Sequence, residues 1–145
     1  MLNGGLMTRI APLVLPAGAA AAALALTGAG QPSALADVQP GLWEITGAPG
    51  AHALMRQCLA DVRVLARFEH RNRNCSARVL KDGGGAMAVD YSCDGAGFGH
   101  SEIEVITPRS LRIATQGISG GLPFNYVLQA RRVADCPRAA TVIRH

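Results

Sequence analysis

The residues that look most like catalytic machinery in this 145-residue chain are Gly117-Ile-Ser119-Gly-Gly121. They match the G-x-S-x-G pattern of a serine nucleophile, and Asp135 and His145 follow in the order found in one class of hydrolases. That motif needs a strand, a sharp turn and then a helix, whereas Pro123 and the alternating residues after it predict another strand. We therefore expect a glycine-rich turn here, with a hydrolase that uses Ser119 as the alternative.

A scattered set of histidines and carboxylates is the next candidate. His100, Glu102 and Asp94 could approach one another at the end of a strand and, with His52 or His70, bind a transition metal. Isolated histidines are more often surface or hydrogen-bonded residues. The sequence therefore predicts neither a metal site nor a cofactor.

Basic and aromatic side chains suggest binding rather than catalysis. The densest basic cluster is Arg63, Arg67, Arg71 and Arg73, which could meet phosphates or carboxylates of an anionic partner, although a solvated charged face is the more usual explanation of such a run. An aromatic content of 4% is too low for base-stacking platforms, so we expect no nucleic-acid partner.

Trp43, Tyr91 and Phe98 are the aromatic candidates for an apolar binding site. Trp43 either anchors the core or lines a pocket, and its large apolar ring favours the core. If a cleft lies near Trp43, we expect a small apolar molecule or a segment of an envelope protein to occupy it, with a response in tryptophan fluorescence.

Residues 1–36 have the organisation of a secretory signal peptide. Arg9 is their only charge, an apolar run covers residues 10–26, and Ala34-Leu-Ala36 forms an A-x-A cleavage site. A retained anchor would need roughly 20 strongly apolar residues, but this run is alanine-rich and interrupted by prolines. We therefore expect export to the periplasm by the general pathway, cleavage after Ala36 and no stable membrane anchor afterwards.

The mature part, residues 37–145, is expected to fold as a single antiparallel β domain. It keeps 13 of the 14 basic residues against 10 acidic ones, a net charge of +3 that singles out no partner. All four cysteines lie in it, and an even count in an exported chain indicates disulfides. Their spacing does not fit zinc, which usually takes close C-x-x-C pairs.

One hairpin register predicts how the cysteines pair. Gly83-Gly-Gly85 reads as a turn, and a hairpin centred on Gly84 places Cys75 opposite Cys93 and Arg78 opposite Asp90. Apolar residues and both cysteines then share one face, which a one-residue slip would destroy. The two remaining cysteines, Cys58 and Cys136, are left to pair with each other.

The other elements follow from periodicity. We expect strands over residues 41–46, 52–58, 98–106, 110–119 and 124–133, a helix over 59–68 and a glycine-rich loop over 117–123. The hairpin around Pro108 should place Val105 opposite Leu111 and Ile103 opposite Ile113. The predicted fold class is mainly β (α+β): a curved antiparallel meander sheet with one short helix, stapled by disulfides.

Several landmarks of the chain resemble a known family, the domain-of-unknown-function family 3617 of short exported bacterial proteins. They are Pro40-Gly-Leu-Trp-Glu-Ile45, Gln57-Cys-Leu59 before the helix, Cys75 and Cys93 around a hairpin, Ala130-Arg131 and Asp135-Cys136. The resemblance implies an envelope location and a structural cysteine set, and it implies no catalytic residue. This chain departs from the pattern by a short insert between Trp43 and Cys58 and by lacking Thr-Pro after Cys-Leu.

The sequence thus favours an exported, non-catalytic domain of unknown role that binds a small ligand or a partner. The alternatives are the hydrolase that uses Ser119 and a structural or stress-related envelope protein that engages its partner through a strand edge.

Overall fold

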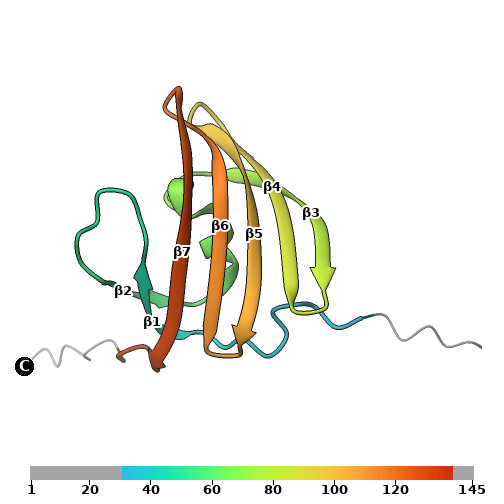
Figure 1. The fold of residues 1–145 in the computed structure, drawn as a ribbon, viewed down its shortest axis with the longest axis vertical. Helices are drawn as coiled ribbons and strands as arrows, with labels where there is room; N and C mark the ends of the chain where they lie inside the picture. The colour runs from blue at the N-terminus through green and yellow to red at the C-terminus, as the bar shows by residue number, and fades with distance from the viewer. Residues whose placement is uncertain (1–30, 139–145) are drawn as a thin grey trace, which may run out of the picture.

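The computed structural model describes residues 31–138. Residues 1–30 of the predicted signal peptide and His145 of the alternative hydrolase hypothesis lie outside them. The described chain forms seven strands and one short helix (Figure 1). In chain order they are β1 (Gly41–Thr46), β2 (Met55–Leu59), η1 (Val62–His70), β3 (Cys75–Gly83), β4 (Ala86–Cys93), β5 (Gly97–Thr107), β6 (Ser110–Ser119) and β7 (Leu122–Ala134).

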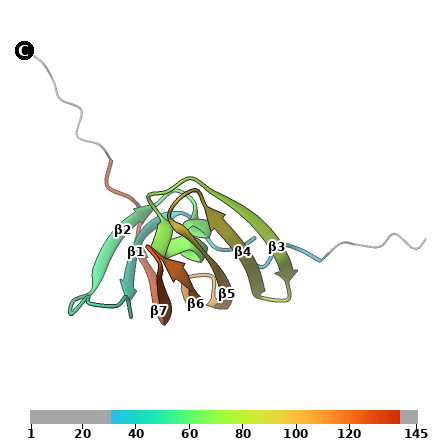
Figure 2. The same cartoon turned by 90° about the horizontal axis from the view of Figure 1, so that it is seen from above.

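All seven strands form one antiparallel sheet in the order β2-β1-β7-β6-β5-β4-β3. Strands β3 to β7 make the predicted meander, and β1 joins it by pairing with the last strand, β7. The helix η1 connects β2 at one edge of the sheet to β3 at the other edge, so it must cross a face of the sheet. Figure 2 shows the sheet curved around η1, which contacts β4, β5 and β6.

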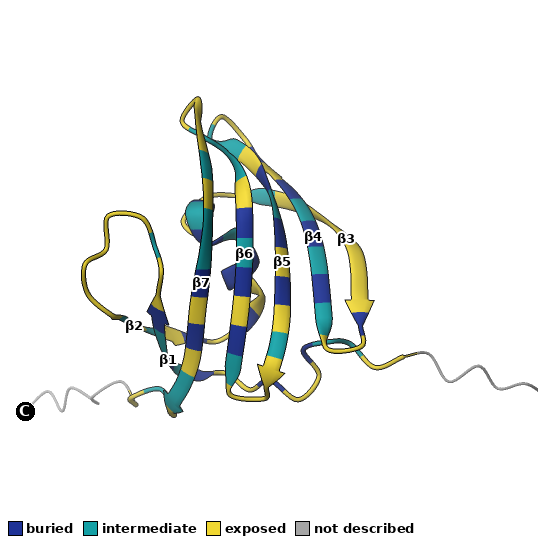
Figure 3. Ribbon diagram, viewed as in Figure 1, coloured by how far each residue is buried: buried dark blue, intermediate teal, exposed yellow. Residues whose placement is uncertain are grey.

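The core lies between the curved sheet and η1. Inward-facing residues alternate with exposed ones along the central strands (Figure 3). The largest fully buried apolar side chains are Trp43, Ile45, Leu65, Ile103, Leu111, Ile113 and Leu128. Edge strand β3 is the exception, because Val79 on its inward-facing side keeps 53% of its surface exposed.

Both predicted hairpin registers are present, each with a small correction near its turn. Cys75 pairs with Cys93 and Val79 with Val89 as predicted, but the strands then shift by one residue at Leu80. The turn is therefore a two-residue one at Gly84-Gly85, both with positive φ, rather than a loop centred on Gly84. Right-handed twist favours such two-residue turns in hairpins, and the bulge at Leu80 absorbs the odd residue.

The hairpin of β5 and β6 is corrected in the same way. Val105 pairs with Leu111 and Ile103 with Ile113 as predicted, and a register shift before Thr107 makes the turn a two-residue one at Pro108-Arg109 rather than a loop centred on Pro108. The glycine-rich loop expected over residues 117–123 is also shorter than predicted. Strand β6 runs on to Ser119, which pairs with Leu122 across a two-residue turn.

The helix begins three residues later than predicted and is a 3₁₀ helix with a break at Arg67, whose backbone is not helical. Asp61 caps its first turn by accepting a hydrogen bond from the Arg63 N–H at 2.9 Å. Leu59, expected on the helix face, instead ends β2 and is buried. Apolar periodicity indicates which face is buried, whereas the capping carboxylate sets where the helix starts.

Two disulfides close the domain, and they are the predicted pairs. Cys75 is joined to Cys93 across β3 and β4, and Cys58 on β2 is joined to Cys136 just after β7. Disulfide bonds are typical of proteins outside the reducing cytoplasm. Within residues 31–138, no helix is long and apolar enough to cross a membrane.

Candidate functional site

A pair of glycines marks a broad depression of the described surface. Gly99 on β5 pairs directly with Gly117 on β6, and Tyr91 and Phe124 continue the same cross-strand row on either side. A Cβ atom at Gly99 would lie 2.5 Å from the Tyr91 hydroxyl oxygen, and one at Gly117 would lie 2.9 Å from the Phe124 ring. The two aromatic rings therefore occupy the space that side chains at these positions would fill.

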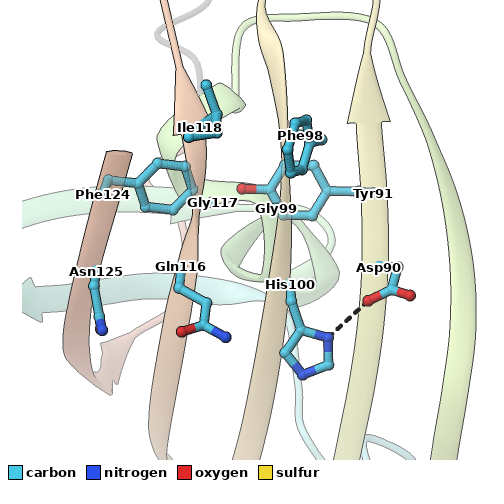
Figure 4. Close-up of a pocket in the computed structure, with 10 residues that line it drawn as sticks. All are labelled: Asp90, Tyr91, Phe98, Gly99, His100, Gln116, Gly117, Ile118, Phe124 and Asn125. Atoms are coloured by element: carbon cyan, nitrogen blue, oxygen red, sulfur yellow. Dashed lines mark hydrogen bonds and ion pairs between the residues drawn. The ribbon is translucent and has the colours of Figure 1, made fainter. Parts of the chain in front are cut away.

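The neighbouring rows point to the opposite face of the sheet, away from η1. One row pairs Phe98 with Ile118, and the other runs from Asp90 through His100 and Gln116 to Asn125. Together with the glycine row they enclose about 730 Å³, which we call the outer depression (Figure 4). Its lining residues are Asp90, Tyr91, Phe98, Gly99, His100, Gln116, Gly117, Ile118, Phe124 and Asn125.

The depression has an apolar half and a polar half. Phe98 keeps 56% of its surface exposed, which is high for a large aromatic residue in a regular strand. Figure 4 shows Phe98 and Ile118 at one end, with His100, Gln116 and Asn125 at the other. The site can therefore offer an apolar contact and several hydrogen-bonding groups to one small molecule.

His100 and Asp90 are the charged groups of the polar half. His100 Nδ1 lies 2.7 Å from an Asp90 carboxylate oxygen, and its Nε2 lies 3.6 Å from Glu102. The hydrogen bond to Asp90 raises the pKa of His100 above its ordinary value of 6.5. The same bond, helped by Arg78 at 3.2 Å, lowers the pKa of Asp90.

A buried histidine supports the floor from the other side of the sheet. His70, at the end of η1, packs edge-on against the rings of Tyr91 and Phe124. Its Nε2 lies 3.1 Å from the Ala96 carbonyl oxygen, which can only accept, so Nε2 carries the proton and donates. Nδ1 is then left to accept the hydrogen bond that the Tyr91 hydroxyl donates at 3.4 Å.

The tyrosines beneath the sheet are neutral structural groups. Tyr126 donates a hydrogen bond to the Glu69 carboxylate at 2.9 Å, and burial together with that bond raises the pKa of Tyr126. Burial also raises the pKa of Tyr91. Both hydroxyls thus stay protonated at neutral pH, and both bond to residues of η1, so they hold the helix against the sheet.

A second cleft, the helix groove, lies between η1 and the β3–β4 hairpin and encloses about 350 Å³. Its apolar wall comes from β3 and β4 and includes the exposed Val79, while Arg63 and Arg67 of η1 stand on the opposite side. Arg67 also donates to the Arg73 carbonyl at 3.2 Å. Arg71 turns away and lies 4.5 Å above the Phe68 ring. The structure thus divides the predicted basic cluster, with two of its four guanidinium groups at this groove.

The aromatic candidates are separated too. Tyr91 and Phe98 both line the outer depression, whereas Trp43 is completely buried in the core on β1 and lines neither cleft. The Trp43 indole N–H has no hydrogen-bond partner. The prediction of a cleft beside Trp43 is therefore replaced by two clefts elsewhere, and tryptophan fluorescence would report on the core.

The hydrolase-like motif at Gly117–Gly121 is not followed by the helix that a serine nucleophile of this kind requires. Ser119 ends β6, and the two-residue turn leads straight into strand β7. Asp135 pairs with Arg132 and is almost fully exposed. Across residues 31–138, no group of three or more His, Cys, Asp or Glu side chains is placed to hold a metal ion.

Sequence reasoning singled out Tyr91 and Phe98 but passed over the glycine pair. Of the polar row it named His100 only as a possible metal ligand and Asp90 only as the partner of Arg78. The glycine pair could have been found from the sequence, because the predicted β5–β6 register, extended away from the turn, places Gly99 opposite Gly117. Two glycines facing each other in neighbouring strands mark a place where another group approaches the backbone closely.

A curved antiparallel sheet wrapped over one 3₁₀ helix and fixed by two disulfides defines a small disulfide-bonded β domain with surface clefts. The family model described as "Protein of unknown function (DUF3617)" matches residues 38–136, and the chain belongs to this family. No curated protein and no solved structure matches the chain.

Proposed function

We propose that this protein is a non-catalytic, periplasmic binding domain that takes a small molecule into the outer depression. The observation that carries the proposal is the adjacency of an exposed phenyl ring, Phe98, to a row of planar polar side chains across a floor of two glycines. The proposal of export is supported by the signal-peptide pattern of residues 1–36 and by the two disulfides.

The geometry favours a ligand with a flat apolar face and hydrogen-bonding groups at one edge. The apolar face would lie against Phe98 and Ile118, while the polar edge would meet His100, Gln116 and Asn125. A volume of about 730 Å³ suits such a small organic molecule. The backbone of Gly99 and Gly117 lies between these two rows and would form the floor beneath the ligand.

The proposal predicts saturable binding that depends on Phe98. We would titrate ¹⁵N-labelled protein with indole, 4-hydroxybenzoate and N-acetylglucosamine and follow the amide signals of Gly99 and Gly117 by NMR. At least one probe should shift both signals in a saturable manner. Phe98→Ala should then weaken that binding about tenfold, because burying a phenyl ring against a ligand is worth about 1.5–3 kcal/mol, offset in part by ordering.

Ile106→Ala is the matched control, since Ile106 lies on the same strand and is exposed to nearly the same extent, 54% against 56% for Phe98. It should leave binding unchanged. The proposal fails if no probe gives saturable shifts, or if the two variants weaken binding equally.

The helix groove supports a second candidate, the binding of an apolar chain that ends in a carboxylate. Charge is the specific observation here, because Arg63 and Arg67 stand beside an apolar wall that includes the half-exposed Val79. Dodecanoate should bind with an affinity that Arg63→Glu lowers about tenfold and that Phe98→Ala leaves intact. Arg109→Glu, in the β5–β6 turn, is the charge-matched control. Equal effects of Arg63→Glu and Arg109→Glu would rule out this second site.

A further inference from the structure

The segment that carries the predicted cleavage motif is built into the folded domain. Leu35 and Val38 are 7% and 8% exposed and belong to the main hydrophobic core. Two consecutive turns shape the segment, with the Ala36 N–H donating to the Ser33 carbonyl at 3.0 Å and the Val38 N–H donating to the Leu35 carbonyl at 3.1 Å. In Figure 1 it runs along the lower ends of the strands, from the β3–β4 hairpin toward β1.

One carboxylate fixes the start of this segment. Asp82, near the end of β3, accepts hydrogen bonds from the Ser33 hydroxyl at 3.0 Å and from the Ala34 N–H at 2.7 Å. Gln31 also lies against the hairpin, since a Cβ atom at Gly83 would come within 3.0 Å of the Gln31 side-chain oxygen. Residues on both sides of the A-x-A motif therefore contact the domain.

Cleavage after Ala36 would remove the contacts made by residues 31–36 from the mature protein. Asp82 would lose both of its donors, and the core would lose the Leu35 side chain, which leaves an apolar hole at this end of the sheet. A domain of this size has a small hydrophobic core, so the loss of Leu35 and of both hydrogen bonds would lower its stability.

An alternative cleavage motif, Thr27-Gly28-Ala29, lies just after the apolar run of residues 10–26. Its residues are small, as signal peptidases require, and cleavage after Ala29 gives a signal peptide within the usual range of about 15–30 residues. Cleavage after Ala36 gives one that is longer than this range.

We propose that the signal peptidase hydrolyses the Ala29–Gly30 bond, and that residues 31–36 remain as the first packed segment of the mature domain. Water supplies the hydroxyl for the new Ala29 carboxyl group and the proton for the new Gly30 amino group. The inference rests on the proposed export but not on ligand binding at either cleft.

The mass of the exported product tests the proposal. The full precursor would be expressed in a bacterium, and the protein released from the periplasm would be measured by intact mass spectrometry. A product that begins at Gly30 is expected. A product that begins at Asp37, or one that keeps Met1 in the periplasmic fraction, would overturn the proposal. A complete absence of product from the periplasm would contradict export itself, and with it the cleavage.

Two variants make the test sharper. Ala29→Lys places a large charged residue where a small one is required and should block processing at this site. Ala36→Lys makes the same change at an exposed residue of the second motif and should leave the mass of the processed product changed only by the substitution. The reverse pattern would show that cleavage occurs after Ala36.

A stability comparison tests the structural premise directly. Purified protein that begins at Gly30 should unfold at least about 5 °C above protein that begins at Asp37, because the longer form keeps Leu35 and both donors to Asp82. Leu35→Ala in the longer form should remove a large part of the difference. Equal unfolding temperatures of the two forms would overturn the assignment of this segment to the domain.

Discussion

At the scale of single residues, His100 is held between two carboxylates at the polar end of the outer depression. His100 Nδ1 lies 2.7 Å from one carboxylate oxygen of Asp90, and an Arg78 nitrogen lies 3.2 Å from the other. Asp90 therefore has a cationic partner on each side. All of these side chains are partly exposed, which limits their contribution to the free energy of unfolding. Their main effect is on the charge that a ligand meets.

We predict a pH window for this pair. The raised pKa of His100 means that its stabilising effect is complete below 6.5 and is lost as pH rises through the raised value. The lowered pKa of Asp90 means that its effect is present above 3.8 and is lost as pH falls through the lowered value. An NMR titration of the His100 ring should therefore give a midpoint above 6.5.

Asp90→Asn is the variant that checks the cause. It removes the negative charge but keeps a side chain of the same shape, so the midpoint of His100 should fall toward 6.5. A midpoint that is unchanged by Asp90→Asn would show that Asp90 does not set the charge of His100.

At the scale of elements, the glycine pair allows the sheet and helix to approach closely. The inner side of Gly99 and Gly117 is filled by Tyr91 and Phe124, and His70 of η1 packs against both rings. Aromatic residues beside glycines in neighbouring strands recover part of the packing that glycine lacks. The floor of the outer depression therefore depends on the helix behind it.

Gly117→Ala tests this packing. A Cβ atom there would clash with the Phe98 carbonyl oxygen and press on the Phe124 ring, so the free energy of unfolding should fall by about 3 kcal/mol. Gly50→Ala is the control, because its loop position has positive φ but open space, and it should cost about 1 kcal/mol. Urea denaturation of both variants provides the measurement, and equal losses would contradict the packing argument.

At the scale of the whole molecule, the two disulfides play unequal parts. Cys75 and Cys93 are 18 residues apart and join strands that already pair as a hairpin. Cys58 and Cys136 are 78 residues apart and join β2, at one edge of the sheet, to the end of β7. Closing the longer loop removes more conformational entropy from the unfolded chain.

Paired Cys→Ser variants should show this difference. The double variant at Cys58 and Cys136 should lose about 4.5 kcal/mol of unfolding free energy, and the one at Cys75 and Cys93 about 3 kcal/mol. Urea unfolding at neutral pH checks both values. A larger loss for the hairpin pair would mean that native-state contacts outweigh loop entropy in this domain.

The sequence by itself determined the two hairpin registers and, through them, the cysteine pairs. Val105 opposite Leu111 and Cys75 opposite Cys93 follow from local alternation, because a slip by one residue would turn every apolar side chain to the wrong face. The bulges near the turns were missed, since they depend on which tight turn best fits the twist of the strands.

Only the tertiary structure decided how these pieces meet. The pairing of β1 with β7 and the passage of η1 across the sheet join residues far apart in the chain, and several arrangements would bury the same apolar faces. That arrangement put Trp43 in the core, left Val79 exposed at an edge and divided the basic cluster. The helix groove arises from the packing of η1 beside the β3–β4 hairpin, whereas the outer depression lies on the neighbouring strands β4 to β7. Sequence periodicity reports only which side of each element is buried.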